Sequence, residues 1–243
     1  MLENYFIIAY FFMIVAFQSI IGVGVLVLGT PFLLILKFNL VEIFFILLPI
    51  SIATSLLNLI IIKFSNKSLK KSTYKEFKKF FMICIPSIFV GLILLKTFEN
   101  FINFKYLVSF VIILSVLLVL LKDKIKYRIN FFRISTLSIV GLVHGLTNSG
   151  GTLMSLAFTA NNDNEYARLN TTFFYLVLAI FQYFLTIIIF FEKFIFLDDI
   201  KIFFILIIGI LIGNLVYYYL RSKIYKVIVN SIAIMSAIIL LTS

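Results

Sequence analysis

Long stretches of this chain carry no charged residue, and they restrict the folds that it can adopt. Tyr5 to Leu36, Ile43 to Ile62 and Leu169 to Phe191 contain no Asp, Glu, Lys or Arg. A helix crosses the ~30 Å hydrocarbon core of a bilayer with about 20 apolar residues, so each stretch is long enough to span a membrane. Only 13% of the 243 residues are charged and 63% are apolar, which leaves too few polar groups to cover a water-soluble protein. The sequence therefore predicts an all-α polytopic protein of the lipid bilayer.

Two of the eight apolar blocks between charged residues are too long for one crossing. As helices, the first and the fifth would measure about 48 and 44 Å, and both contain clustered glycines. Glycine and proline interrupt helices, and bare backbone at membrane depth must be surrounded by protein or water. We therefore expect these two blocks to be broken helices and the other six to be single spans. The blocks are residues 5–36, 43–62, 80–95, 106–121, 134–162, 169–191, 202–220 and 227–243.

Lysine and arginine concentrate in the segments Lys63–Lys79, Lys122–Arg133 and Arg221–Lys226. Short basic loops remain in the cytoplasm, and all three segments lie on that side if the fifth block is a hairpin that enters and leaves there. Arg168 is then a fourth cytoplasmic connector residue, and the acidic connector around Asp198 lies outside. We expect a multi-pass protein of the cell inner (plasma) membrane in this orientation.

The two halves of the chain follow one plan, a broken block and then three spans. A hairpin plus three crossings is an odd number of passes, so the second half must be inverted relative to the first. Inverted repeats are common in secondary transporters, which bind substrate at discontinuous helices near the midplane of the membrane. The predicted repeats are residues 1–122 and 134–243, joined by a basic cytoplasmic linker at 123–133.

The broken blocks also share a spacing of residues. Gly22-x-Gly24 is followed by Pro31, and Asn148-x-Gly150 is followed at the same distance by Ala157. A polar residue also precedes each motif by four positions. The next span of each half then carries a pair of hydroxyl residues, Thr54-Ser55 in the first half and Thr171-Thr172 in the second.

In these features the chain resembles the sulfite exporter family of TauE/SafE-like membrane proteins. Each half of such a protein begins with a Gly-x-Gly-Gly-Gly-x-x-x-x-Pro pattern, followed by Thr-Ser at the start of the next helix. The resemblance covers nearly the whole chain and includes Gly91 and Gly209-x-x-x-Gly213 in the third span of each half. It implies export or uptake of small oxyanions or organosulfonates. The departures from the pattern are Val25, Leu26, Asn148, Thr152 and Ala157.

The residues of the broken blocks favour an anionic substrate on physical grounds as well. The N-terminus of a half-helix presents free backbone N–H groups and the positive end of the helix dipole. No apolar block contains Asp or Glu, so we expect neither a carboxylate cation site nor an acidic proton relay. Neutral donors would hold sulfite, a sulfonate or a carboxylate weakly enough to release it. The candidate substrate-binding residues are Gly22, Gly24, Thr30, Thr54, Ser55, Asn58, His144, Thr147, Asn148, Ser149, Gly150, Gly151, Thr152, Thr171 and Thr172.

Several candidates have a second interpretation that the sequence leaves open. Glycines also serve close helix packing, and a lone Ser or Thr can bond a carbonyl of its own helix. His144, the only histidine, is either a substrate ligand that couples transport to protons or a neutral imidazole bonded to a neighbouring helix. Gln18 holds the equivalent place in the first half, and Asn170 and Gln182 are weaker candidates of the same kind.

Other classes of function fit the sequence less well. The basic connectors lack the interleaved aromatic residues of a nucleic-acid surface, and the single cysteine, Cys84, forms no metal cluster. Asn148-Ser149-Gly150 resembles the serine segment of rhomboid proteases, but the only available base is five residues away on the same broken element. We therefore expect no enzyme and no cofactor, and the rival hypothesis is a non-transporting membrane scaffold or assembly factor. The sequence does not determine the direction of transport or whether two copies form a homodimer.

Overall fold

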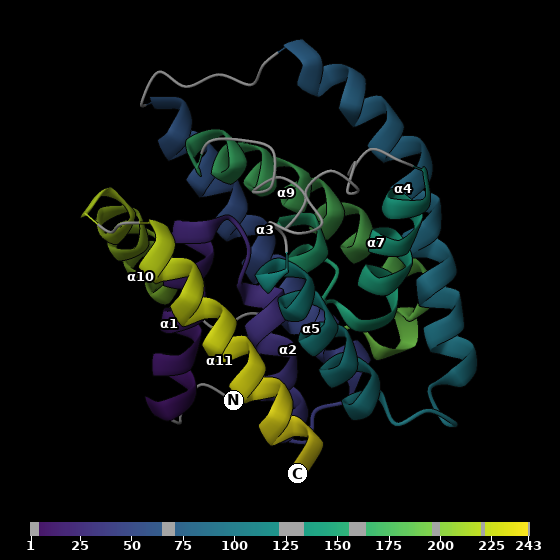
Figure 1. Cartoon of the computed structure of the whole chain (residues 1–243). Coiled ribbons are helices and arrows are strands. Elements are labelled where there is room, and N and C mark those ends of the chain that lie inside the picture. Colours follow the sequence, from purple (N-terminus) through teal and green to yellow (C-terminus); the bar gives the residue numbers. More distant parts are fainter. Residues whose placement is uncertain are drawn as a thin grey trace.

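The computed structural model describes residues 5–64, 71–121, 134–155, 164–195, 200–219 and 222–242. Every regular element in these ranges is a helix (Figure 1), which confirms the all-α prediction. Four helices contain a segment long and apolar enough to cross a membrane: Leu40–Ile62, Glu76–Phe98, Ala167–Ile189 and Ile202–Tyr219.

The helices fall into two series that match the expected order of blocks. The first series is α1 (Tyr5–Ile21), α2 (Val25–Ile35), α3 (Leu40–Phe64), α4 (Lys71–Phe98) and α5 (Phe104–Leu120). The second is α7 (Ile134–Thr147), a helical turn at residues 151–155, α9 (Asn164–Ile189), the 3-10 helix η1 (Phe191–Lys193), α10 (Ile200–Tyr219) and α11 (Ser222–Thr242).

The first apolar block folds back on itself. Its helix stops at Gly22, where the backbone has φ +90°, a conformation that favours glycine. Helix α2 then runs antiparallel to α1, because the Tyr10 hydroxyl donates to the Leu28 carbonyl at 2.7 Å and the Tyr10 ring stacks on Phe32. The break at 22–24 lies in the glycine cluster on which the expected interruption rested.

The second long block turns at the corresponding place. Asn148 has φ +62°, in the left-handed region that asparagine tolerates better than most residues. The chain then folds back over α7, since a Cβ on Gly150 would lie 2.6 Å from the Val140 carbonyl oxygen and 2.7 Å from His144 Cβ. The glycine is therefore required for this close approach.

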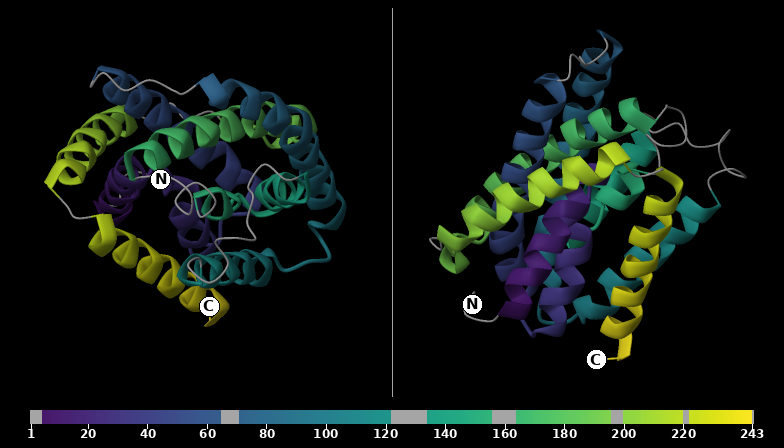
Figure 2. Two further views of the ribbon diagram at one scale, coloured as in Figure 1. Left: turned by 45° about the horizontal axis from the view of Figure 1, so that its top comes forward. Right: turned by 90° about the vertical axis from the view of Figure 1, so that its left-hand side faces the viewer.

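The two series of helices are packed into one another rather than side by side (Figure 2). Helices α3 and α9 pack together, α4 covers α7, α10 covers α1, and α5 lies beside α11. Glycines allow backbones to meet in two of these contacts: a Cβ on Gly145 would lie 2.4 Å from the Ile88 carbonyl oxygen, and one on Gly213 would lie 2.5 Å from that of Ala16. This is the packing role that small residues have in membrane helices.

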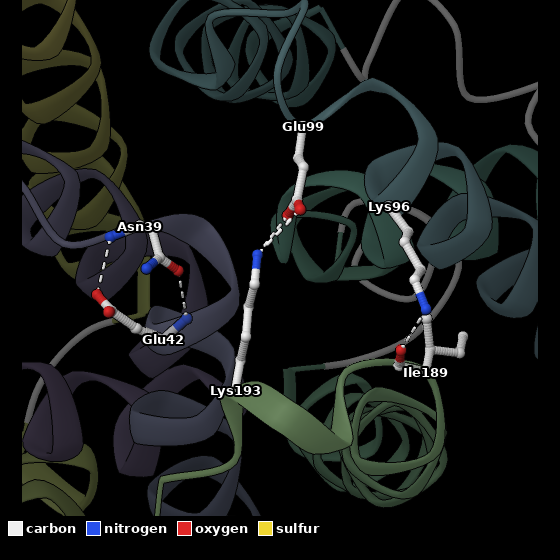
Figure 3. Close-up of polar contacts among 6 residues, drawn as sticks. All are labelled: Asn39, Glu42, Lys96, Glu99, Ile189 and Lys193. Atoms are coloured by element: carbon white, nitrogen blue, oxygen red, sulfur yellow. Dashed lines mark hydrogen bonds and ion pairs between the residues drawn. The ribbon is translucent and has the colours of Figure 1, made fainter.

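One end of the bundle is joined by polar contacts between the two series (Figure 3). Lys193 Nζ lies 2.9 Å from Glu99 Oε2, and Lys96 Nζ donates to the Ile189 carbonyl at 3.0 Å. Asn39 and Glu42 cap the start of α3 reciprocally, each side chain accepting from the backbone N–H of the other. A cavity of about 310 Å³ opens at this end between the α2–α3 turn, the α4–α5 connector and Lys193.

Large apolar side chains cover the outside of the bundle. On α4, Phe89 is 45% exposed, and on α10 Phe203 and Leu211 are 67% and 60% exposed. A water-soluble surface does not carry such a concentration of aromatic and aliphatic side chains, whereas a lipid-facing one does. The described part of the chain is that of a multi-pass membrane protein.

The sequence boundaries need correction where helices continue past charged residues. Helix α4 begins at Lys71, so residues 71–79 belong to the helix and not to the basic connector, because lysine is a good helix former and does not end a helix. The predicted linker at 123–133, Ala157 of the second glycine motif, and Asp198 with Asp199 lie outside the described residues.

Candidate substrate-binding site

The two breaks lie against the middle of the two central helices. Ser51 and Tyr175 are each the twelfth residue of their helix, in α3 of 25 residues and α9 of 26. Gln18, just before the first break, bonds Ser51, and Gly151, just after the second, lies against the Tyr175 ring. Both breaks are therefore near mid-depth of the bundle, where discontinuous helices of transporters bind substrate.

Gln18 organises the first break. Its Oε1 accepts the backbone N–H of Val25 at 3.0 Å, which satisfies the first free donor of α2. Its Nε2 donates to the Ser51 carbonyl at 3.0 Å and to Ser55 Oγ at 2.9 Å. Gln18 thus ties the start of α2 to α3. Among the sequence candidates here, Gly24 lies at the N-terminus of α2 and Ser55 is already an acceptor.

A polar network beside this break joins four helices. Asn58 of α3 donates to Ser19 Oγ at 3.1 Å and accepts from Asn214 of α10 at 2.8 Å. Arg168 of α9 donates to the Ser19 carbonyl and to Asn214 Oδ1. The Arg168 guanidinium also stacks over the Tyr217 ring, 4.0 Å from its centre. The candidate Asn58 is therefore engaged in holding helices together.

The placement of Arg168 corrects the prediction that it is a connector residue. Its side chain is only 8% exposed, since α9 begins four residues earlier, at Asn164. Carbonyl and amide oxygens from α1 and α10 replace the water that the guanidinium loses. A positive charge therefore lies buried next to the first break, a feature that charge counting along the sequence could not distinguish from a loop residue.

Hydroxyl groups at the second break are mostly used locally. Thr147 donates to the Val143 carbonyl, Ser149 to that of Thr147, and Thr152 to that of Ser149. Asn148 donates to Thr30 of α2 across a longer separation of 3.4 Å. A hydroxyl has one proton, so the three that serve carbonyls have none left for an anion in this conformation.

The two hydroxyl pairs occupy different positions. Thr54 donates to the carbonyl of Ile50 in its own helix, and Ser55 faces Gln18 of the same half. Thr172 donates to the Arg168 carbonyl and lies against Gly22 of the other half, where a Cβ on the glycine would be 2.8 Å from its Oγ1. Thr171 is buried and its hydroxyl has no partner among the described residues.

Several buried polar atoms near the second break have no hydrogen-bond partner in the described part of the chain. Both ring nitrogens of His144 are of this kind, although its backbone carbonyl accepts from Gln182. The same holds for Asn148 Oδ1, the Tyr175 hydroxyl and Gln182 Oε1. Asn170 Oδ1 is a further case on α9. Native proteins leave few buried polar atoms unbonded, and a local group of them requires an explanation such as a ligand.

These residues form a site that is closed in this conformation. His144, Asn148, Ser149, Thr172 and Gln182 are all fully buried. Within the described ranges no group of His, Cys, Asp and Glu side chains is arranged to hold a metal ion. The available chemistry is therefore that of neutral donors, backbone N–H groups and one nearby guanidinium, which suits a small anion.

Sequence reasoning did not identify Tyr175, Ser51 or Arg168 as site residues. Tyr175 lies in an aromatic-rich run, Thr-Thr-Phe-Phe-Tyr, in which nothing distinguishes its hydroxyl from the neighbouring phenylalanines. Only the position of Gly151 against its ring marks it. Gln18 was visible as the counterpart of His144, but its bonds to α3 were not.

A comparison with protein families matches residues 6–240 to the family described as sulfite exporter TauE/SafE. No curated protein and no solved structure matches the chain significantly. The family match covers nearly the whole chain and includes both helix breaks. The chain belongs to the sulfite exporter TauE/SafE family of membrane transporters.

Proposed function

We propose that this protein is a secondary transporter that moves small organic or sulfur-containing anions, such as sulfite, a sulfonate or a carboxylate, by alternating access at the two helix breaks. The main support is the group of buried, unbonded polar atoms on His144, Asn148 and Tyr175 beside the second break. Leaving such atoms unpaired costs about 1–3 kcal/mol each. A bound substrate would supply their partners.

The proposed site comprises the candidates from both halves in two roles. Gly22, Gly24, Gly150 and Gly151 let backbones and rings approach the breaks closely. The hydroxyls that bond nearby carbonyls keep the breaks in shape, and the unbonded groups contact the substrate. The shape-keeping set is Thr54, Thr147, Ser149, Thr152 and Thr172, and the contact set is His144, Asn148 and Thr171, with Thr30, Ser55 and Asn58 beside them.

We also propose that the two halves form inverted repeats. The packing is reciprocal: α4 of the first half covers α7 of the second, and α10 of the second covers α1 of the first. A twofold relation between the halves exchanges these two contacts. The central pair α3 and α9 and the outer pair α5 and α11 would each lie across the axis.

The membrane potential supplies energy for one direction of transport. A negative-inside potential drives an anion outward by about 2.3 kcal/mol per charge per 100 mV, so export needs no coupled ion and uptake needs one, for which protons are the candidate. We place the protein in the cell inner membrane with its lysine-rich end in the cytoplasm, following the distribution of basic residues.

Flux into proteoliposomes tests the proposal. Labelled sulfite, methanesulfonate and acetate are supplied with and without an inward proton gradient, to wild type and to three variants. Asn148→Gly keeps the left-handed backbone but removes the side chain, so we expect a stable protein with reduced flux. Ser149→Ala is the matched control, because its hydroxyl serves a local carbonyl, and it should retain most of the flux.

His144→Ala separates binding from coupling. Loss of the proton dependence with anion flux retained would assign proton coupling to His144, and loss of all flux would assign it to substrate binding. A folded, correctly inserted wild-type protein that moves none of these anions would contradict the proposal and favour a non-transporting scaffold.

A further inference from the structure

Tyr175 occupies the point where the two halves meet at the breaks. Its side chain is completely buried in the middle of α9. The ring lies flat across the second break, where a Cβ on Gly151 would be 2.4 Å from Cε2, and the His144 ring is 6.1 Å away between centres. Only a glycine at position 151 leaves room for the ring.

The hydroxyl of Tyr175 points across to the first break. It lies near the Ser51 hydroxyl and the backbone of Gly24 and Leu26, at the N-terminus of α2. It forms no hydrogen bond of normal geometry with any described residue. A tyrosine hydroxyl inside a membrane protein normally finds a partner, so its proton is available here.

The groups around this point are predominantly hydrogen-bond donors. The first N–H groups of a helix have no partner within it, and Gln18 takes only that of Val25. The Ser51 hydroxyl is held only by long contacts to Gln18, of 3.3 and 3.4 Å. Helix α2 is 11 residues long, and its positive dipole end faces the same point. Donors that converge without an acceptor describe a place for an oxyanion.

We propose that the Tyr175 and Ser51 hydroxyls and the backbone N–H of Leu26 bind one oxyanion group of the substrate. This subsite rests on the proposed transport function and gives it a definite location, at the N-terminus of α2. His144 and Asn148, on the far side of the Tyr175 ring, face the remainder of the substrate. Because Tyr175 belongs to the second half and α2 to the first, the bound anion joins the two halves.

The test compares Tyr175→Phe with Tyr183→Phe. The first removes one hydroxyl and retains the ring, so the fold should survive. The second removes a hydroxyl from a half-buried tyrosine two turns further along α9 whose ring packs on Phe45. Loss of a hydrogen bond to a charged group predicts about a 10- to 100-fold rise in the KM for sulfite and methanesulfonate in Tyr175→Phe, with a much smaller change in Vmax. Tyr183→Phe should keep the wild-type KM.

Ligand-dependent thermal stabilisation in detergent gives a reading that does not require flux. Sulfite should raise the unfolding temperature of wild type and Tyr183→Phe, and the rise should be largely lost in Tyr175→Phe and reduced in Ser51→Ala. An unchanged KM and unchanged stabilisation in Tyr175→Phe would overturn the subsite. A wild-type protein that sulfite stabilises through Tyr175 without any flux would keep the subsite and reject transport. No stabilisation of wild type would overturn the subsite itself.

Discussion

Replacement of Gly22 by alanine should destabilise the first helix break through two effects. The backbone at this position has φ +90°, which costs a residue with a Cβ about 1–2 kcal/mol. The new Cβ would also lie 2.8 Å from Thr172 Oγ1 and 3.1 Å from the Arg168 carbonyl oxygen. Overpacking of this kind costs about 1–3 kcal/mol, so Gly22→Ala should lower the free energy of unfolding by roughly 2–5 kcal/mol.

Gly29→Ala is the control for this substitution. Gly29 is inside α2, and its Cβ would meet terminal methyl groups of Leu47 and Ile14, which can move. Alanine also gains up to about 1 kcal/mol of helix propensity there, so the variant should remain close to wild type.

Thermal or denaturant unfolding in detergent, followed by far-UV circular dichroism, measures both variants. Thr172→Ala added to Gly22→Ala should restore part of the loss, because it removes the hydroxyl but leaves the contacts to the backbone and the strained φ. The reasoning is refuted if Gly22→Ala unfolds like Gly29→Ala, or if Thr172→Ala restores the whole loss.

Three further predictions concern packing, the buried charge and orientation. Gly145→Ala would place a Cβ 2.4 Å from the Ile88 carbonyl oxygen and should lower unfolding stability by about 1–3 kcal/mol, measured by the same unfolding assay. Arg168→Lys should also lower it, since a lysine cannot reproduce the planar contacts to two oxygens and a ring; stability equal to wild type would contradict the buried network. In intact cells, a membrane-impermeant thiol reagent should label Asn103→Cys and spare Lys78→Cys until the membrane is permeabilised, and the opposite pattern would reverse the proposed orientation.

The sequence was sufficient to predict those features of the fold that depend on local composition. Apolar length identifies the helices, and the clusters at Gly22 and Gly150 mark the two interruptions, because glycine is unfavourable in a helix wherever it lies. The helix starts were less well predicted, since α4 continues into the lysine-rich segment from Lys71 onward. Block boundaries drawn at charged residues reflect the membrane and not the hydrogen bonding of the helix.

The site was predicted only in part because its contacts join residues far apart in the chain. Gly22 meets Thr172, and Arg168 meets Ser19 and Asn214. No local spacing encodes such contacts. The matching of Thr54-Ser55 with Thr171-Thr172 by spacing did not reveal that Ser55 faces its own half and Thr172 the opposite one.

The reciprocal cover of α7 by α4 and of α1 by α10 has a consequence for how the protein is made. When the ribosome has completed the first half, the faces of α4 around Gly91 and of α1 around Ala16 have no helix to pack against, because their partners have not yet been synthesised. The halves must therefore wait for one another in the bilayer and assemble late. Either half produced alone should be exposed to membrane quality-control proteases, and co-expression of the two as separate chains should protect both.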